Sequence, residues 1–108
     1  MWKIDRGSQI GITTNNFTEA LSWNVSEIGK KTILLKNTDT TNSLQYRLDG
    51  YVSYGGIENE LVPLYKLTPG EIAEFHYDHQ WCKLVLQVKA AVSGNQANYR
   101  VDYEGQGA

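Results

Sequence analysis

The chain has 108 residues, the size of one domain, and such a domain buries roughly two-thirds of the surface that its unfolded chain exposes. We therefore expect a single domain over residues 1–108. The ten basic and twelve acidic residues are interspersed and give a net charge of −2. No basic stripe exists to neutralise a phosphate backbone, which argues against a nucleic-acid partner. No run of about twenty apolar residues exists to cross a membrane, which argues against a membrane partner.

The first ten residues, MWKIDRGSQI, lack the apolar segment and the small-residue cleavage site of a secretory signal peptide. The only cysteine, Cys82, has no partner for an internal disulfide. Both features are typical of a protein made in the cytoplasm, where thiols stay reduced.

The first third of the chain predicts extended structure. We expect short strands near residues 10–13 and 21–25, with a single helical turn at residues 18–21. Residues 30–37, KKTILLKN, form the first clear strand. The consecutive apolar residues 33–35 indicate a central strand that is covered on both faces at that point.

The N-terminal segment, residues 1–29, leaves two interpretations open. Apolar and polar residues alternate from Trp2 through Ile4 to Ile12, but no tight turn joins this stretch to a following strand. The segment is then either an arm that adds to a sheet of a neighbouring copy, or a strand that pairs within its own domain.

The middle of the chain holds the most regular alternation. Residues 37–43 are small and polar and predict a loop, and residues 44–54, LQYRLDGYVSY, predict a strand. One face of that strand carries Leu44, Tyr46, Leu48 and Val52, and the other carries Gln45, Arg47, Asp49 and Tyr51. Gly50, inside the strand, indicates a bulge or a bend.

Turn residues divide the second half of the chain. Pro63 cannot donate a ladder hydrogen bond, so residues 60–67 predict an edge strand or an irregular strand. Residues 68–71, Thr-Pro-Gly-Glu, predict a type II turn. A further turn is expected at residues 93–96, and residues 97–104 form the last strand.

Residues 72–77 and 81–92 alternate as two strands, and residues 78–80 between them read as the connection of a β-hairpin. The even positions of the second strand, from Cys82 to Val92, are all apolar, which places Cys82 in the core. In the first strand Ala73, Phe75 and Tyr77 face the core, which places His76 on the outside.

Short strands at regular spacing, with turn chemistry between them and no sustained helical period, predict an all-β chain. We expect a single β-sandwich of about seven to nine mostly antiparallel strands. Spacing alone leaves both a jelly roll and an immunoglobulin-like topology open.

The stretch EFHYDHQWC, residues 74–82, concentrates the reactive side chains of the chain. A metal ion needs ligands that converge within about 2.0 to 2.3 Å of one point. Cys82 and His76 are predicted on opposite faces, and only His76, Asp78 and His79 could share an exposed spot. The same separation excludes a Cys–His nucleophile pair. We therefore expect no metal, no cofactor and no catalytic residues.

Aromatic residues offer the second candidate site. Outward-facing Trp81, Tyr51 and Tyr54 could stack on a sugar, or these rings could belong to the core and to subunit contacts. Glu58 and Glu60 lie on a glycine-rich loop and read as solvated charges, because no second carboxylate cluster faces them across a cleft.

The series KKTILLKNTDTTNSLQYRLDGY, LTPGEIAEF and WCKLVLQVKAAVSGNQANYRVDYEG resembles small β-sandwich virion proteins of phages and other viruses. The resemblance covers residues 30–105, and the matching residues are Asn37, Leu44, Tyr46, Gly50, Pro69, Gly70, Val88, Lys89, Gly94, Val101, Tyr103 and Gly105. It implies a virion accessory role, such as a capsid decoration or tail protein, with no catalytic residues.

The sequence thus predicts a non-enzymatic structural or assembly protein that acts through protein–protein contacts. The expected partners are further copies of the chain, most simply in a trimeric ring, and a capsid or other virion protein into whose particle the chain is incorporated. The alternative is a carbohydrate-binding module whose exposed aromatics bind a glycan. The residues expected to make these contacts are Trp2, Ile4, Tyr51, Tyr54 and Trp81.

Overall fold

The computed structural model describes residues 4–53, 55–78 and 81–107, and over these residues the chain forms eight β-strands. The strands are β1 (Ile4–Ile12), β2 (Thr18–Asn24), β3 (Lys30–Asn37), β4 (Leu44–Tyr51), β5 (Asn59–Leu67), β6 (Ile72–Tyr77), β7 (Lys83–Ala90) and β8 (Asn98–Gln106). Within the described residues no helix is long and apolar enough to cross a membrane.

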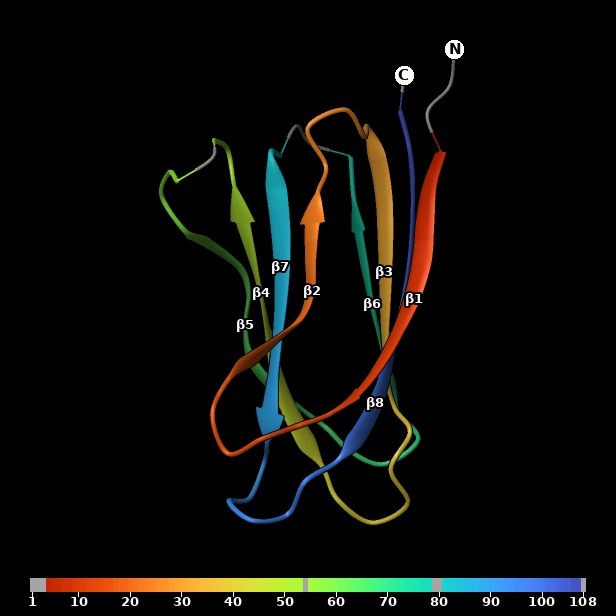
Figure 1. The fold of residues 1–108 in the computed structure, drawn as a ribbon, viewed down its shortest axis with the longest axis vertical. Helices are drawn as coiled ribbons and strands as arrows, with labels where there is room; N and C mark the ends of the chain where they lie inside the picture. Colours follow the sequence, from red (N-terminus) through yellow and green to blue (C-terminus); the bar gives the residue numbers. More distant parts are fainter. Residues whose placement is uncertain (1–3, 54, 79–80, 108) are drawn as a thin grey trace.

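The strands form two antiparallel four-stranded sheets (Figure 1). The order is β1-β8-β3-β6 in the first, called sheet A, and β2-β7-β4-β5 in the second, called sheet B. Every connection except β4–β5 crosses from one sheet to the other, and this interleaved order is that of a jelly roll. The predicted β-sandwich is confirmed, and the topology falls on the jelly-roll alternative.

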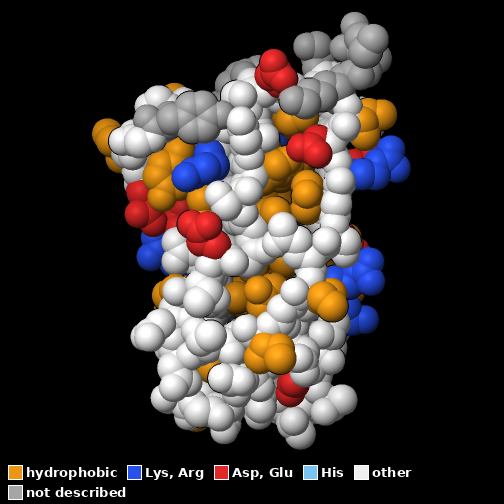
Figure 2. All heavy atoms as spheres, viewed as in Figure 1, with side chains coloured by type: hydrophobic (Ala, Val, Ile, Leu, Met, Phe, Trp, Pro, Cys, Tyr) orange, Lys and Arg blue, Asp and Glu red, His pale blue; other side chains and the backbone are white. Residues whose placement is uncertain are grey.

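The core lies between the sheets, because alternate residues of each strand are apolar and point inward. Its fully buried side chains come from both sheets and include Ile33, Leu35, Leu48, Leu86 and Val101. Figure 2 shows hydrophobic side chains in the middle of the view, between the two layers that Figure 1 draws as ribbons. The packed interior leaves the outer faces and the free strand edges as the surfaces available for function.

Local turn chemistry acts as the sequence predicts. Gly70 has a φ of +84°, and the Glu71 N–H donates to the Thr68 carbonyl at 3.0 Å, as a type II turn requires. Gly94, in the second predicted turn, has a φ of +88°. The strand that contains Pro63, β5, lies at the edge of sheet B.

Two local predictions were wrong. Residues 18–21 form the start of β2 rather than a helical turn. A bulge between Glu19 and Leu21 places the consecutive residues Ala20 and Leu21 both in the core, and this pattern resembles that of a helix. Residues 78–80 do not close a hairpin, because β6 pairs with β3 in sheet A whereas β7 pairs with β2 and β4 in sheet B.

The strand of residues 44–54 is shorter and bends elsewhere than predicted. It ends at Tyr51, and Val52 is 74% exposed instead of facing the core. The irregularities in its pairing with β5 lie between Tyr46 and Asp49, ahead of Gly50.

The N-terminal segment is built into the sandwich of its own chain. Strand β1 pairs with β8 over nine residues, from the Ile4–Gln106 pair to the Ile12–Asn98 pair. Trp23 on β2 also donates its indole N–H to the carboxylate of Asp5 at 2.9 Å, which ties β1 to the opposite sheet. Of the two interpretations of residues 1–29, pairing within the domain is the one seen in the single chain.

Candidate functional site

The aromatic side chains considered as a sugar platform do not share one face. Tyr51 ends β4 on the outer face of sheet B, where Lys83 Nζ lies 4.9 Å from its ring centroid. Trp81 packs inward against the core, over Gly50: a Cβ at Gly50 would lie 3.0 Å from Trp81 Cε3. This differs from the outward position expected for Trp81. Trp2 and Tyr54 lie outside the described residues.

The reactive side chains of residues 74–82 are divided between the two sheets. His76, on β6 of sheet A, is exposed, and its Nδ1 lies 3.1 Å from Thr32 Oγ1. Cys82 is a buried free thiol directly before β7 of sheet B, as the inward prediction required. Among the described residues, which omit His79, no three His, Cys, Asp or Glu side chains are grouped to hold a metal ion.

The outer face of sheet A carries rows of charged and polar side chains that the sequence did not single out. The strand register aligns them across β1, β8 and β3 as Ile10–Arg100–Lys36, Ser8–Asp102–Leu34 and Arg6–Glu104–Thr32. Only the pairing register brings these residues together, because β1 and β8 lie at opposite ends of the chain.

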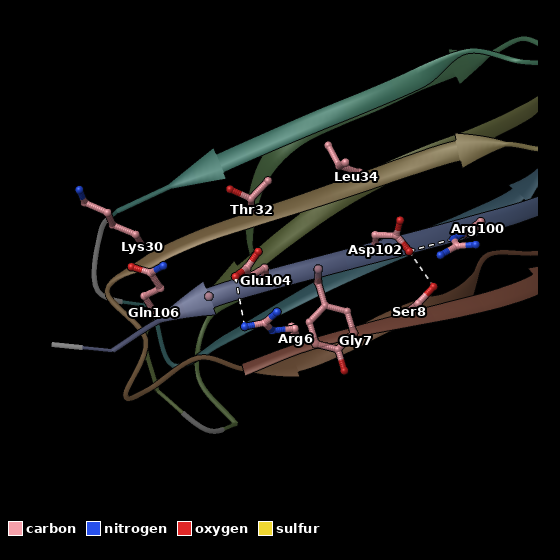
Figure 3. Close-up of a pocket in the computed structure, with 12 residues that line it drawn as sticks. Arg6, Gly7, Ser8, Lys30, Thr32, Leu34, Arg100, Asp102, Glu104 and Gln106 are labelled. Atoms are coloured by element: carbon pink, nitrogen blue, oxygen red, sulfur yellow. Dashed lines mark hydrogen bonds and ion pairs between the residues drawn. The ribbon is translucent and has the colours of Figure 1, made fainter. Parts of the chain in front are cut away.

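The rows of Ser8 and Arg6, together with Arg100, line a shallow groove of about 650 Å³, shown in Figure 3. At its centre Asp102 accepts a hydrogen bond from Ser8 Oγ at 2.6 Å and another from Arg100 Nε at 2.9 Å. The bond from Ser8, followed by that from Arg100, lowers the pKa of Asp102 below its usual value. Arg6 approaches Glu104 at 3.9 Å in the next row. The charges of the groove are thus largely paired with each other.

Leu34 gives the groove an apolar residue between these charged groups. It is half-buried on the outer face, whereas its neighbours Ile33 and Leu35 are buried in the core. The sequence predicts that residues 33–35 of β3 are buried on both faces of the sheet. In the structure only the inner face, with Ile33 and Leu35, is fully buried. Leu34 is therefore a partly buried apolar residue surrounded by polar and charged side chains.

Beside the groove, β1 forms one of the two edges of sheet A, at the right of Figure 1. Its outer face exposes three isoleucines: Ile4, Ile10 and Ile12 are 52%, 82% and 57% exposed. Lys and Arg side chains lie along the same margin in Figure 2. Of the predicted contact residues that the structure describes, Ile4 is therefore the one found on an exposed apolar edge.

The outer face of sheet B holds a buried carboxylate, Asp49, which is not among the candidate residues predicted from the sequence. Asp49 has no exposed surface, and it accepts hydrogen bonds from Arg47 Nη2 at 2.9 Å and from Gln87 Nε2 at 3.4 Å. Arg47 also forms an ion pair with Glu58 on the β4–β5 connection. The alternation of Arg47 and Asp49 on one face was the available signal.

Asp49 changes how Glu58 titrates. A hydrogen bond with Asp49, and then the negative charge of Asp49, raise the pKa of Glu58. A carboxyl group beside a second carboxyl group could serve in acid–base chemistry, but Arg47 forms an ion pair with both Asp49 and Glu58. The cluster therefore fastens the β4–β5 connection to the face of sheet B.

No known family model matches this chain, and no curated protein matches it in sequence. Solved structures do match its fold. A protein of the Bacillus endospore appendages, which form disulfide-linked pili, is 12% identical, with a TM-score of 0.62 over 99% of this chain and 89% of its own. The mitogen of Yersinia pseudotuberculosis is 13% identical, with a TM-score of 0.64 over 92% of this chain and 84% of its own.

A protein of the infectious bursal disease virus particle also matches, at 8% identity and a TM-score of 0.57. That match covers 97% of this chain but only 30% of the viral protein, so the chain corresponds to about a third of it. The fold is thus one that a virus particle protein shares, as the resemblance implied. At these identities the similarity defines the fold, and one fold can serve several functions.

Proposed function

We propose that this chain is a non-enzymatic structural protein that acts through protein–protein contacts, as an accessory component of a virus particle such as a capsid decoration protein. Its partners are further copies of itself and a protein of the particle into which it is incorporated. One observation carries the proposal: the free edge strand β1 combines unpaired backbone groups with exposed Ile4, Ile10 and Ile12.

An open strand edge favours association for a physical reason. Backbone N–H and C=O groups along such an edge have no partner in the chain's own sheet, and an added strand satisfies them. Exposed aliphatic side chains beside the edge add apolar area to bury. Both features are present along β1, next to a groove whose polar groups already pair with each other.

The comparisons support an assembly role at the level of the fold. Structures with this fold include a protein of pilus-like appendages and a protein of a virus particle. The separation of His76 from Cys82 is consistent with a function that needs no chemical step.

Sedimentation of the purified chain over a wide concentration range tests the proposal, together with a turnover screen for hydrolase, transferase and redox activities. We expect concentration-dependent association and no turnover. A robust activity that is lost when His76 or Asp78 is replaced by Ala would disprove the non-enzymatic role. A chain that neither self-associates nor binds purified virus particles would disprove the assembly role.

A further inference from the structure

The four free edges of the sandwich differ in how well they are protected against adding a strand. Charges, proline, bulges and short length protect an edge. Strand β2 has a bulge between Glu19 and Leu21, and β5 has Pro63 and an irregular register with β4. Strand β6 is only six residues long and presents Glu74 on its outer face.

Strand β1 has no proline, no bulge and no shortened length over its described residues. It is nine residues long, contains no proline, and pairs with β8 without a register shift. Of its two charged side chains, Asp5 is held by the indole of Trp23, and Arg6 lies 3.9 Å from Glu104. Among the described strands, β1 is therefore the edge most open to a partner.

The backbone groups of β1 that face this free edge can be assigned from the hydrogen-bond phase. Directly after β1, the Thr13 N–H donates to the Ala97 carbonyl, which precedes β8. Directly after β3, which flanks β8 on its other side, the Thr38 N–H donates to the Asn98 carbonyl. Because antiparallel pairs alternate, the odd residues of β1 bond to β8 and the even residues face outward. The even residues are also the ones whose side chains, Ile10 among them, lie on the outer face.

We propose that β1 pairs antiparallel with β1 of a second copy, about a two-fold axis at Ser8, so that two A sheets join into one. In this register Ser8 faces Ser8 of the partner copy, Arg6 faces Ile10, and Ile4 faces Ile12. Each even residue faces an even residue of the second copy, so the outward N–H and C=O groups of both strands meet in phase. Exposed isoleucines meet at both ends, and no like charges are opposed.

A second copy is the favoured occupant because the pattern of β1 is complementary to itself when reversed. A two-fold contact uses the same surface on both copies, and this register uses the full length of the strand. Strand addition alone buries a small interface, so we expect dissociation on the order of micromolar. The inference rests on the proposed function and replaces the trimeric ring by a closed dimer.

The first test is cross-linking of a Ser8→Cys variant under mild oxidation. Directly paired residues in this position have Cα atoms about 5.5 Å apart, within the roughly 4.4 to 6.8 Å that a disulfide allows. We expect a covalent dimer. Ser22→Cys, exposed on the protected edge strand β2, is the matched control, and the unmodified chain tests for cross-linking through buried Cys82. A dimer that forms equally well with Ser22→Cys overturns the proposal.

The second test measures the mass of Ile10 variants by light scattering. Lysine at position 10 would face Arg6 of the second copy, and glutamate would attract it, so we expect Ile10→Lys to weaken the dimer roughly tenfold and Ile10→Glu to retain it. Ile57→Lys is the control, since Ile57 is 88% exposed but lies on a loop. Thermal unfolding of each variant separates loss of association from loss of folding.

The outcomes distinguish this inference from the proposed function. A trimer, or an oligomer that Ile10→Lys leaves intact, overturns the β1 pairing but leaves an assembly role standing. A chain that is monomeric at every concentration overturns the pairing, and the assembly role then depends on binding to virus particles alone.

Discussion

Gly7 on β1 lies directly opposite Tyr103 on β8, and the tyrosine ring occupies the space that a side chain at Gly7 would need. A Cβ at Gly7 would lie 2.6 Å from Tyr103 Cζ. Tyr99 covers Gly11 in the same way, four residues further along β1. An aromatic ring over a cross-strand glycine stabilises an edge strand that glycine would otherwise weaken. These two pairs hold β1 in the sheet.

The Gly7–Tyr103 pair predicts a coupled effect on stability. Gly7→Ala should destabilise the fold by about 1 to 3 kcal/mol, because Tyr103 must leave its place beside Trp23. The same change should cost about 1 kcal/mol less when Tyr103 is already Ala. Urea unfolding of the four proteins in this cycle measures the coupling. Gly29→Ala is the control and should cost less, because its Cβ would meet only the Gln106 carbonyl at 3.6 Å. If the effects of Gly7→Ala and Tyr103→Ala simply add, the prediction is wrong.

Asn37, at the end of β3, predicts a large effect from a single amide. It is fully buried, its Nδ2 donates to the Asn42 and Leu67 carbonyls at 3.0 Å, and its Oδ1 accepts the Asp39 N–H at 2.9 Å. Asn37→Ala leaves the Leu67 carbonyl without this donor and should cost about 1 to 3 kcal/mol in unfolding free energy. Asn24→Ala, at an exposed asparagine, should cost much less. Equal losses for Asn37→Ala and Asn24→Ala would show that the buried hydrogen bonds of Asn37 do not stabilise the fold.

Asp39 predicts acid sensitivity in the loop that Asn37 holds. Backbone N–H groups of Asn42, Thr41 and Asn98 lower the pKa of Asp39 from 3.8 to about 2. Because the folded pKa is depressed, the stabilisation is present above about pH 4 and is lost as the pH falls through 2. The unfolding free energy of the native chain should exceed that of Asp39→Asn near neutral pH, and the difference should shrink over this range. A difference independent of pH would contradict the assignment.

Glu58 predicts a pH dependence of opposite sign. Its pKa is raised by Asp49, so its protonated form suits the fold better than its ionised form. The favourable contribution is present at low pH and is lost as the pH rises through the raised pKa. Glu58→Gln should therefore gain stability relative to the native chain as the pH rises from acid to neutral. Thermal unfolding across this range measures the effect, and a relative loss with rising pH would instead mean that the Arg47 ion pair dominates.

Much of the strand content could be predicted from the sequence, because a strand's pattern depends on its own residues. Alternating apolar positions placed Cys82 in the core and His76 outside, and Pro69-Gly70 marked a turn that only glycine's positive φ allows. The residues of β3 and β6 were predicted with the observed ends.

Partners of strands could not be predicted in the same way. Residues 78–80 have hairpin chemistry, yet the chain crosses there from sheet A to sheet B, because burying both apolar faces requires β6 and β7 to lie in different layers. The groove could not be foreseen either, since Ser8 and Asp102 become neighbours only through the β1–β8 register.

The sequence by itself therefore determined the all-β class, the turns and the inward or outward direction of most side chains, because these depend on a period of two and on local backbone geometry. Only the tertiary structure decided the jelly-roll order, the burial of Asp49 and the position of β1 as an unprotected edge. Those features arise from pairing between residues far apart in the chain, and many registers are compatible with one alternating pattern until both sheets pack.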